Sequence, residues 1–256
     1  MVPFVYWVSR FLLRLLFLIY LKAEVVGTEN LPRRGGVIIV ANHLHNADPG
    51  IVGVFLRRRV VFMAKAEMFE WPVWGFYVRL IGAFPVRRFE ADLAALRKAS
   101  QIVSKGGVLV MFPEGTRSET ATMAQGHPGT ALVALRSGVS ILPIGITGTE
   151  AIHIPQTLFR PLFGRLKVRM VVGKPFFLPP QERINTAAVE RCTEIIMRQV
   201  ASLLPAGYRG VYGEGAEVTE EAAPQPTSPS SVEPTGTSAG GGQTAARPGG
   251  SAPGGG

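Results

Sequence analysis

The 256-residue chain is poor in several residue types that would define its class. A single cysteine, Cys192, excludes an internal disulfide framework and favours a reducing, cytoplasmic environment. Acidic residues are also scarce, because 18 Asp and Glu stand against 27 Lys and Arg, for a formal net charge of +9. This excess of basic residues favours an anionic partner: nucleic acid, an anionic membrane or a phosphorylated small molecule. The chain has no basic-aromatic motif typical of nucleic-acid binding, so no nucleic-acid partner is expected.

A long, uninterrupted apolar run is missing as well. The amino terminus reads MVPFVYWVSRFLLRLLFLIYLK, which is strongly apolar but contains Arg10 and Arg14. A helix that crosses a bilayer needs roughly 18 apolar residues with few charges, so this segment is not predicted to span one. It is predicted instead to lie in the membrane interface, with its arginines at the headgroups. The residues expected to enter the lipid are Phe11, Leu12, Leu15 and Leu18. A helix buried against the rest of the protein is the alternative.

Composition divides the chain into three predicted parts. Residues 1–30 are expected to form the membrane-associating helix, and residues 31–206 the folded domain. Residues 207–256 are rich in Gly, Pro and Ser. Such a segment buries too little apolar surface to offset the entropy lost on ordering, so it is expected to be disordered.

Within the domain, short apolar segments alternate with helical patterns. This alternation predicts an α/β fold with a largely parallel sheet flanked by helices. Ligands of such sheets bind beyond the carboxyl ends of the strands. Two polar motifs, NHLHNAD (42–48) and PEGTRS (113–118), directly follow predicted strands. The predicted strands are 37–40, 60–64, 83–86, 108–112, 139–146 and 166–172, and the predicted helices begin at Asp48-Pro49 or span 68–80, 92–107, 128–136 and 186–204.

His43 and Asp48 in the first motif are candidates for general-base catalysis. An imidazole removes a proton from an attacking hydroxyl when a carboxylate fixes its tautomer and stabilises the resulting cation. Five residues across a strand-to-helix turn can fold back far enough for that contact. The alternative for Asp48 is a helix N-cap, because Pro49 after it suits the first helical turn. The two roles are compatible, since each carboxylate oxygen could serve one of them.

His45 raises the possibility of a metal site, since His-x-His places two rings on one side of an extended segment. Metallo-hydrolases built on this pattern also need Asp and His at the fourth and fifth positions after the first His. Those positions hold Ala47 and Asp48 here. With one cysteine and no companion histidine pair, the chain is not expected to bind a catalytic metal.

The second motif, FPEGTRS (112–118), suits a hydroxylated, phosphorylated ligand. Gly115 lets the backbone approach closely, and Arg117 offers a planar fork to a phosphate. Glu114 can accept hydrogen bonds from hydroxyl groups. Arg87 and Arg88 follow another predicted strand and form a second cationic pair. The alternative for each motif is an ordinary strand-exit turn with solvated charges.

Four stretches, in this order, resemble the motifs of the glycerolipid acyltransferases, a family that includes the 1-acylglycerol-3-phosphate (lysophosphatidic acid) acyltransferases. They are Asn42-His43 with Asp48, Gly82 with Arg88, Phe112–Ser118, and Leu142-Pro143-Ile144. The resemblance covers roughly residues 20–175. His-x4-Asp alone is common by chance, whereas FPEGTRS at this distance from it is highly specific.

The resemblance implies a function and a role for each motif. The family transfers a fatty acyl group from acyl-CoA or acyl-carrier protein to a lysophospholipid acceptor, without a cofactor or metal, at a membrane surface. His43 would be the general base and Asp48 its orienting partner. This enzyme is therefore expected to be a 1-acylglycerol-3-phosphate acyltransferase at the cytoplasmic face of the cell membrane. The residues implied in acceptor binding are Arg88, Glu114, Gly115, Thr116 and Arg117.

The chain departs from the family pattern at three places. His45 stands where many members have Ser, and Arg87 where many have an acidic residue. The segment after FPEGTRS often has a Lys shortly before a Gly, and residues 125–129 contain none. These departures leave the acceptor open: glycerol 3-phosphate or another lysolipid would use the same mechanism. A non-catalytic lipid-binding protein is the alternative from a different class.

Overall fold

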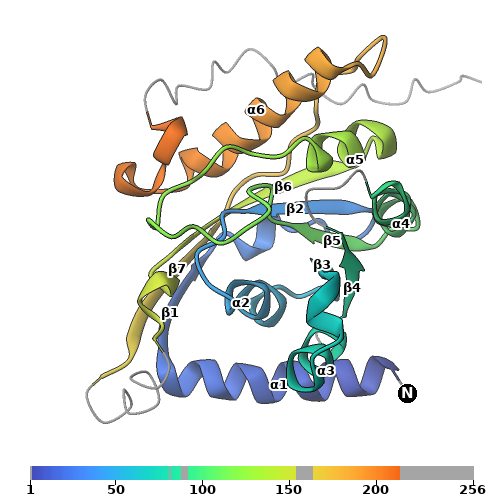
Figure 1. Cartoon of the computed structure of the whole chain (residues 1–256). Helices are drawn as coiled ribbons and strands as arrows, with labels where there is room; N and C mark the ends of the chain where they lie inside the picture. Colours follow the sequence, from blue (N-terminus) through green and yellow to red (C-terminus); the bar gives the residue numbers. More distant parts are fainter. Residues whose placement is uncertain (1, 81, 88–91, 154–163, 214–256) are drawn as a thin grey trace, which may run out of the picture. The chain divides into compact units, whose positions relative to one another are not determined.

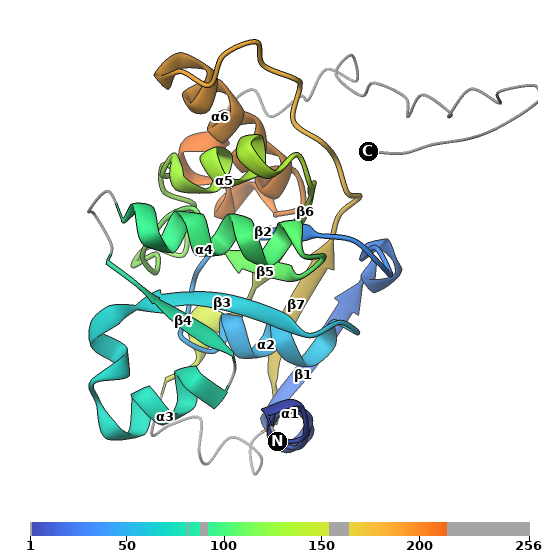
Figure 2. The same cartoon turned by 90° about the vertical axis from the view of Figure 1, so that its right-hand side faces the viewer.

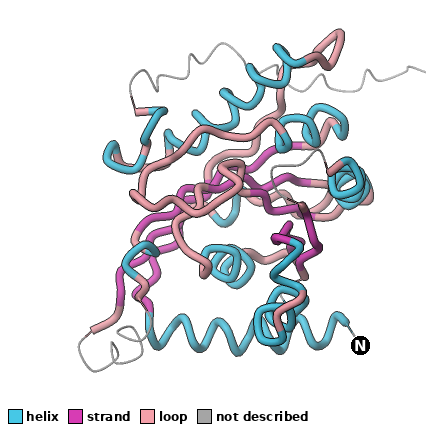
Figure 3. Tube along the Cα trace, in the orientation of Figure 1, coloured by secondary structure: helices cyan, strands magenta, loops and turns pink. Residues whose placement is uncertain are grey.

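The computed structural model describes residues 2–80, 82–87, 92–153 and 164–213. All of them lie in the first of the two units into which the chain divides, Met1–Ala223 and Pro224–Gly256. Figure 1 shows this first unit as a twisted sheet with helices on both faces, and Figure 3 separates its helices, strands and loops by colour. The predicted α/β class is confirmed.

The sheet has seven strands in the order β1-β7-β6-β2-β5-β3-β4. Every neighbouring pair is parallel except β6 and β7. Each of the six predicted strands occurs, with ends within one residue of those expected. Central strand β2 is buried along its whole length because helices cover both of its faces. The strands are β1 (Leu21–Val26), β2 (Val37–Ala41), β3 (Val60–Lys65), β4 (Ala83–Val86), β5 (Val108–Met111), β6 (Ser140–Thr147) and β7 (Leu166–Val172).

Helices enclose the sheet on both faces (Figures 1 and 2). One face carries α1 (Val2–Tyr20), α2 (Asp48–Phe55) and α3 (Pro72–Leu80), and the other carries α4 (Leu93–Ser104), α5 (Gly129–Ser137) and α6 (Thr186–Ser202). Each face has its own apolar core. The short 3-10 helices are η1 (Thr28–Asn30), η2 (Ala66–Phe69), η3 (Thr149–Ala151), η5 (Ala206–Tyr208) and η6 (Gly210–Tyr212).

Strand β1 was not among the predicted strands. It begins at Leu21, immediately after α1 ends at Tyr20, and pairs in parallel with β7. Its side chains alternate between inner and outer positions, the period of a strand. The apolar helix before it hides this alternation in the sequence. The segment 1–30 therefore contributes an edge strand to the domain sheet.

The end of the folded unit also differs from the prediction. Residues 206–212, most of which were assigned to a disordered tail, form η5 and η6. The Tyr208 hydroxyl donates to Glu150 Oε1 at 2.6 Å, and the buried Tyr212 hydroxyl accepts from the Gly126 backbone N–H at 3.0 Å. Two tyrosines thus anchor a Gly-rich segment whose composition alone indicates disorder. The predicted tail from residue 214 onward lies outside the described residues.

Helix α1 packs on α2 with one side and exposes the other. Arg10 donates hydrogen bonds to the Val54 and Leu56 carbonyls, which lie at the end of α2. Cations commonly bind the last carbonyls of a helix in this way. The prediction that Arg10 lies at lipid headgroups is therefore wrong, whereas Arg14 is exposed. In the described part of the chain, no helix meets the length and hydropathy needed to traverse a bilayer.

Candidate active site

The site lies at the carboxyl ends of β2 and β5. Asn42, the first residue after β2, makes a pair of hydrogen bonds with the backbone of Ile146 in β6. Its Nδ2 donates to the Ile146 carbonyl at 2.8 Å, and its Oδ1 accepts from the Ile146 N–H at 2.8 Å. Asn42 thereby imitates one more backbone residue of β2 and fixes the point at which the chain leaves the sheet.

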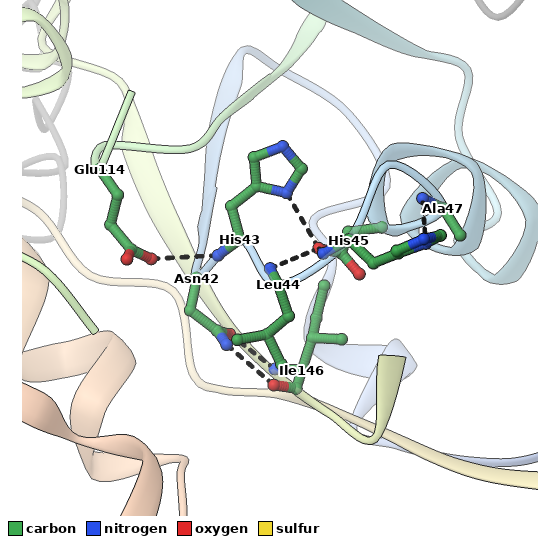
Figure 4. A network of polar contacts seen from close by, with 8 residues as sticks. Asn42, His43, Leu44, His45, Ala47, Glu114 and Ile146 are labelled. Carbon is green, nitrogen blue, oxygen red and sulfur yellow. Dashed lines mark hydrogen bonds and ion pairs between the residues drawn. The ribbon is translucent and has the colours of Figure 1, made fainter. Parts of the chain in front are cut away.

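His43 and Asp48 are in direct contact, as predicted. His43 Nδ1 lies 2.9 Å from Asp48 Oδ2, and both residues are buried, with exposed fractions of 6% and 0%. The same Asp48 oxygen accepts from the Leu44 and His45 backbone N–H groups, each at 2.7 Å. Because that oxygen is an acceptor for all three, His43 carries its proton on Nδ1. In Figure 4 the dashed contact of the His43 ring ends at one ring nitrogen, Nδ1, and the other, Nε2, points away from that contact, where it is available as a base.

Asp48 does not cap α2. The N-cap is Ala47, and the backbone groups bound by the Asp48 side chain precede it in the chain. The capping interpretation was therefore wrong, because the turn brings Asp48 back onto its own approach segment. The second carboxylate oxygen, Oδ1, is buried and has no hydrogen-bond partner among the described residues. Asp48 is thus dedicated to His43 and to the turn that carries it.

Glu114 binds the backbone on either side of the site. Its Oε1 accepts from the His43 N–H at 3.0 Å, and its Oε2 accepts from the Ala124 N–H at 2.9 Å. Ser118 N–H donates to the His43 carbonyl at 2.8 Å, so the FPEGTRS loop holds both polar backbone groups of His43. Burial raises the pKa of Glu114 to about 7. These contacts show Glu114 as a positioning residue for His43, and its direct contact with the acceptor stays a prediction.

The groove in front of His43, hereafter the catalytic groove, has a volume of ≈ 390 Å³. Thr116 and Arg117 line it together with His43, so the structure brings these three predicted site residues together. Phe112 also lines it and stacks on the His43 ring, with centroids 4.3 Å apart. The groove therefore combines a base, a cation and an aromatic wall. Its lining further includes Asn46, Pro49, Phe62, Met63, Ala64, Lys65, Glu67, Met68, Trp71, Tyr77 and Val78.

Comparison with known proteins places this geometry in a family. The acyltransferase family profile matches residues 22–147, from β1 to the end of β6. The crystal structure of a 1-acyl-sn-glycerophosphate (LPA) acyltransferase from Thermotoga maritima aligns with a TM-score of 0.56 at 26% identity, over 79% of each chain. The chain therefore contains an acyltransferase domain, which extends from β1 to β6.

Two curated relatives support the same assignment. A 1-acyl-sn-glycerol-3-phosphate acyltransferase from Streptococcus pneumoniae is 28% identical over 185 residues, which is 71% of this chain and 66% of the relative. Another, from Borreliella burgdorferi, is 31% identical over 146 residues, 56% of this chain and 58% of the relative. The chain thus spans about three fifths to two thirds of the length of these two acyltransferases.

Gly115 and His45 do not line the catalytic groove. Gly115 has a φ of 70°, and a Cβ there would meet His127 Cδ2 at 2.8 Å, so the turn requires glycine. It lines a neighbouring groove, together with Arg87. Arg88 lies outside the described residues. His45 accepts from the Ala47 N–H through its Nδ1 at 3.2 Å, and burial lowers the pKa of its ring.

Two features of the site were missed by sequence reasoning. Lys65, the last residue of β3, adds a second cation to the catalytic groove. Its position at the end of a strand was the available signal. The other feature is an apolar cavity of ≈ 360 Å³ between α1, α2 and α3. It shares Pro49, Phe62 and Tyr77 with the catalytic groove, and no local sequence pattern indicates it because three separate helices form its walls.

Among the described residues, no three His, Cys, Asp or Glu side chains are grouped so that they could hold a metal ion. Cys192 is buried in α6 among the residues that pack against the opposite face of the sheet.

Proposed function

We propose that the protein transfers a fatty acyl group from a thioester donor to the free hydroxyl of 1-acylglycerol 3-phosphate, giving phosphatidic acid. The observation that carries this proposal is the 2.9 Å contact between His43 Nδ1 and Asp48 Oδ2 in a chain of the acyltransferase family. It leaves Nε2 as a base beside a cationic groove. Both relatives named here as 1-acyl-sn-glycerol-3-phosphate acyltransferases support the choice of acceptor.

The proposed reaction needs no nucleophile from the protein. His43 Nε2 takes the proton of the acceptor hydroxyl while its oxygen attacks the thioester carbonyl carbon. Asp48 stabilises the imidazolium that forms. The tetrahedral intermediate then collapses, the carbon–sulfur bond breaks, and the leaving thiolate takes the proton from His43. General-base catalysis contributes about 10²–10⁴-fold, and the remainder comes from positioning and from stabilisation of the oxyanion.

The cations of the catalytic groove suit the phosphate of the acceptor. Arg117 and Lys65 both line the groove near His43, and Thr116 adds a hydroxyl. A guanidinium binds a phosphate through two parallel hydrogen bonds. The predicted contribution of Arg88 belongs to the same proposal.

A membrane surface is the proposed partner, at the cytoplasmic face. The outward side of α1 is apolar, with Phe11 60% and Leu15 44% exposed. On α3 and just before it, Trp71, Val73 and Phe76 are also exposed. Exposed apolar patches of this kind mark a partner surface, and the net charge of +9 favours an anionic bilayer. A lysolipid acceptor would then reach the catalytic groove from the bilayer, since Trp71 also lines that groove.

The test is thiol release from palmitoyl-CoA and from palmitoyl-acyl-carrier protein, measured with and without 1-acylglycerol 3-phosphate. Glycerol 3-phosphate and other lysolipids serve as competing acceptors. We expect acceptor-dependent release that falls about 10²–10⁴-fold in His43→Ala. His153→Ala, a change at an exposed histidine outside the groove lining, is the matched control and should stay active. Circular dichroism establishes that both variants are folded.

Two results would contradict the proposal. Full activity in His43→Ala would exclude the general-base mechanism. Binding of lysolipid without thiol release from either donor would favour the non-catalytic lipid-binding protein, whereas release that depends on another acceptor would keep the mechanism and change the substrate.

A further inference from the structure

A second groove opens beside the catalytic groove. It has a volume of ≈ 480 Å³ and lies between α4 and α5, where β3 and β5 end. We call it the α4–α5 groove. It shares Met63 and Phe112 with the catalytic groove, and the Phe112 ring is the one that stacks on His43. The two grooves therefore meet at the aromatic wall beside the base, one from each face of the sheet.

The lining of the α4–α5 groove is mostly apolar, with polar groups at a few places. Arg87 and His127 are exposed and supply basic side chains, and the first turn of α5 contributes Thr130. Asp92 is the acidic residue in the lining. Its carboxylate is engaged, because Oδ1 accepts from the Ala95 N–H at 2.9 Å and Oδ2 from the Arg87 N–H at 3.0 Å. The remaining lining residues are Met63, Val86, Leu93, Leu96, Met111, Phe112, Pro113, Gly115, Pro128, Gly129 and Leu132.

The basic side chains of this groove lie at two of its ends. Arg87, just after β4, is an exposed cation in the lining, and His127, Pro128 and Gly129 line the groove where α5 begins. Arg117 lines the catalytic groove and is not part of this lining. The α4–α5 groove therefore has a cation of its own.

Acyl transfer brings two phosphate-bearing substrates to one base. The acceptor hydroxyl must reach His43, and the catalytic groove already supplies cations for the acceptor phosphate. The donor needs a second path to the same point. CoA and acyl-carrier protein present the same chemical group there, a narrow phosphopantetheine arm with the thioester at one end and a phosphate at the other. A mostly apolar groove that begins at Phe112 and carries a cation has the matching arrangement.

We propose that the α4–α5 groove binds the phosphopantetheine arm of the acyl donor, with the donor phosphate at Arg87. The inference rests on the proposed function and deepens it, because it assigns each substrate to one groove. Arg87 is then a specificity-determining residue for the donor. Asp92 holds the Arg87 backbone in place through its N–H while its own charge is engaged at the start of α4.

The experiment compares Arg87→Ala with Arg97→Ala, a matched loss of an exposed arginine that does not line the groove. The two donors are S-palmitoyl-4′-phosphopantetheine and S-palmitoyl-pantetheine, which differ by the phosphate alone. We expect Arg87→Ala to raise the donor KM about 10-fold or more with the phosphorylated compound, the usual scale for a lost charge-assisted hydrogen bond. With the unphosphorylated compound the KM should not change. The KM of the acceptor should not change in either case.

Natural donors separate the sources of the phosphate. Palmitoyl-CoA and palmitoyl-acyl-carrier protein should both lose affinity in Arg87→Ala. Loss with CoA alone would place Arg87 at the nucleotide and overturn the assignment to phosphopantetheine. An increase in the acceptor KM instead would show that the α4–α5 groove binds the acceptor, and would overturn the inference. An unchanged donor KM in an active Arg87→Ala enzyme would overturn the inference and leave the proposed function standing. The proposed function is contradicted by other results: a wild-type enzyme without thiol release, or full activity in His43→Ala.

A second variant tests the groove without changing its charge. Leu96→Trp adds volume at a half-buried position of the groove lining. The donor KM should rise at least 10-fold for all four donors while the acceptor KM stays at the wild-type value. An equal rise for donor and acceptor, or no rise in a folded variant, would contradict the assignment.

Discussion

Helices α1 and α6 cover opposite faces of the same sheet, yet their outward sides differ. On α6 the outward positions include Ala187, Glu190 and Arg191, as expected for a helix that faces water. The outward side of α1 is apolar almost throughout: Phe4, Trp7, Val8, Phe11, Leu12, Leu15, Leu16, Leu18 and Ile19 are exposed there. The face covered by α6 thus presents a polar surface to water, whereas the face covered by α1 presents an apolar surface suited to contact with a further apolar layer.

Beneath these helices, each face has a buried apolar core. Ile51 of α2 and Ile196 of α6 are both buried, with exposed fractions of 0% and 1%. The difference between the two faces therefore concerns the side chains that the outer helices present. The apolar exterior of α1 is therefore a property of its own outward side chains.

The largest expected effect on stability comes from truncating one buried side chain in the core of each face. Ile51→Ala and Ile196→Ala should each lower the free energy of unfolding by about 2–5 kcal/mol, because each leaves a cavity in a filled core. Chemical denaturation in a micelle-free buffer measures both values. A loss of less than 1 kcal/mol at Ile51 alone would show that the α1 side is loosely packed and would break the comparison.

The second prediction concerns the pH dependence of stability that the buried Glu114 carboxyl contributes. In the unfolded chain this carboxyl ionises near 4.5, whereas burial raises its pKa in the fold to about 7. Between these values the folded protein holds the extra proton, so stability from this group falls as pH rises through that window. Relative to Glu114→Gln, the wild type should lose on the order of 3 kcal/mol between pH 4 and pH 8.

The measurement is the unfolding free energy of both proteins at intervals across that range. Their difference isolates Glu114 from the other titrating groups. A constant difference would mean that the buried carboxyl keeps its ordinary pKa. Activity of Glu114→Gln should also fall, since an amide cannot accept from both backbone N–H groups that the carboxylate now binds.

The third prediction sharpens the contrast between the outer helices. Phe11→Glu with Leu15→Glu places two carboxylates, four residues apart, on the exposed side of α1. Binding to anionic vesicles should weaken on the order of 100-fold, because charged groups partition poorly into the bilayer. Ala187→Glu with Arg191→Glu makes the same spacing on α6 and should leave binding within about 2-fold. Vesicle sedimentation decides between them. The α6 pair changes the net charge by −3 and the α1 pair by −2, so weakening by the α6 pair at least as large as that by the α1 pair would mean that net charge alone drives attachment.

Much of this architecture is predictable from the sequence because its signals are local. Buried parallel strands are short, β-branched runs, and the polar motifs after β2 and β5 stand directly at their ends. His43 and Asp48 are five residues apart, so one turn suffices to bring them together. Strand β1 escaped prediction because its alternating pattern follows an apolar helix without a break.

Features built from distant segments were not predictable in this way. Arg10 meets the carbonyls of Val54 and Leu56 only once α1 has packed on α2. Tyr208 and Tyr212 order a Gly-rich end through contacts with Glu150 and Gly126, residues far away along the chain. Glu114 could be expected near the site, but its use as a backbone acceptor depends on where Ala124 lies. In each case the hydrogen-bond partner is a residue that comes close only in the folded structure.

Helix α1 ends at Tyr20 and β1 begins at Leu21, with no residue between them. A flexible tether would let the domain wander through a volume set by the length of the tether. The direct junction removes that freedom. On the bilayer that we propose as its partner, the domain would therefore keep a fixed distance from the membrane and a fixed orientation relative to it. The rate at which the protein meets lipid molecules would then be set by lateral diffusion in the plane of the bilayer.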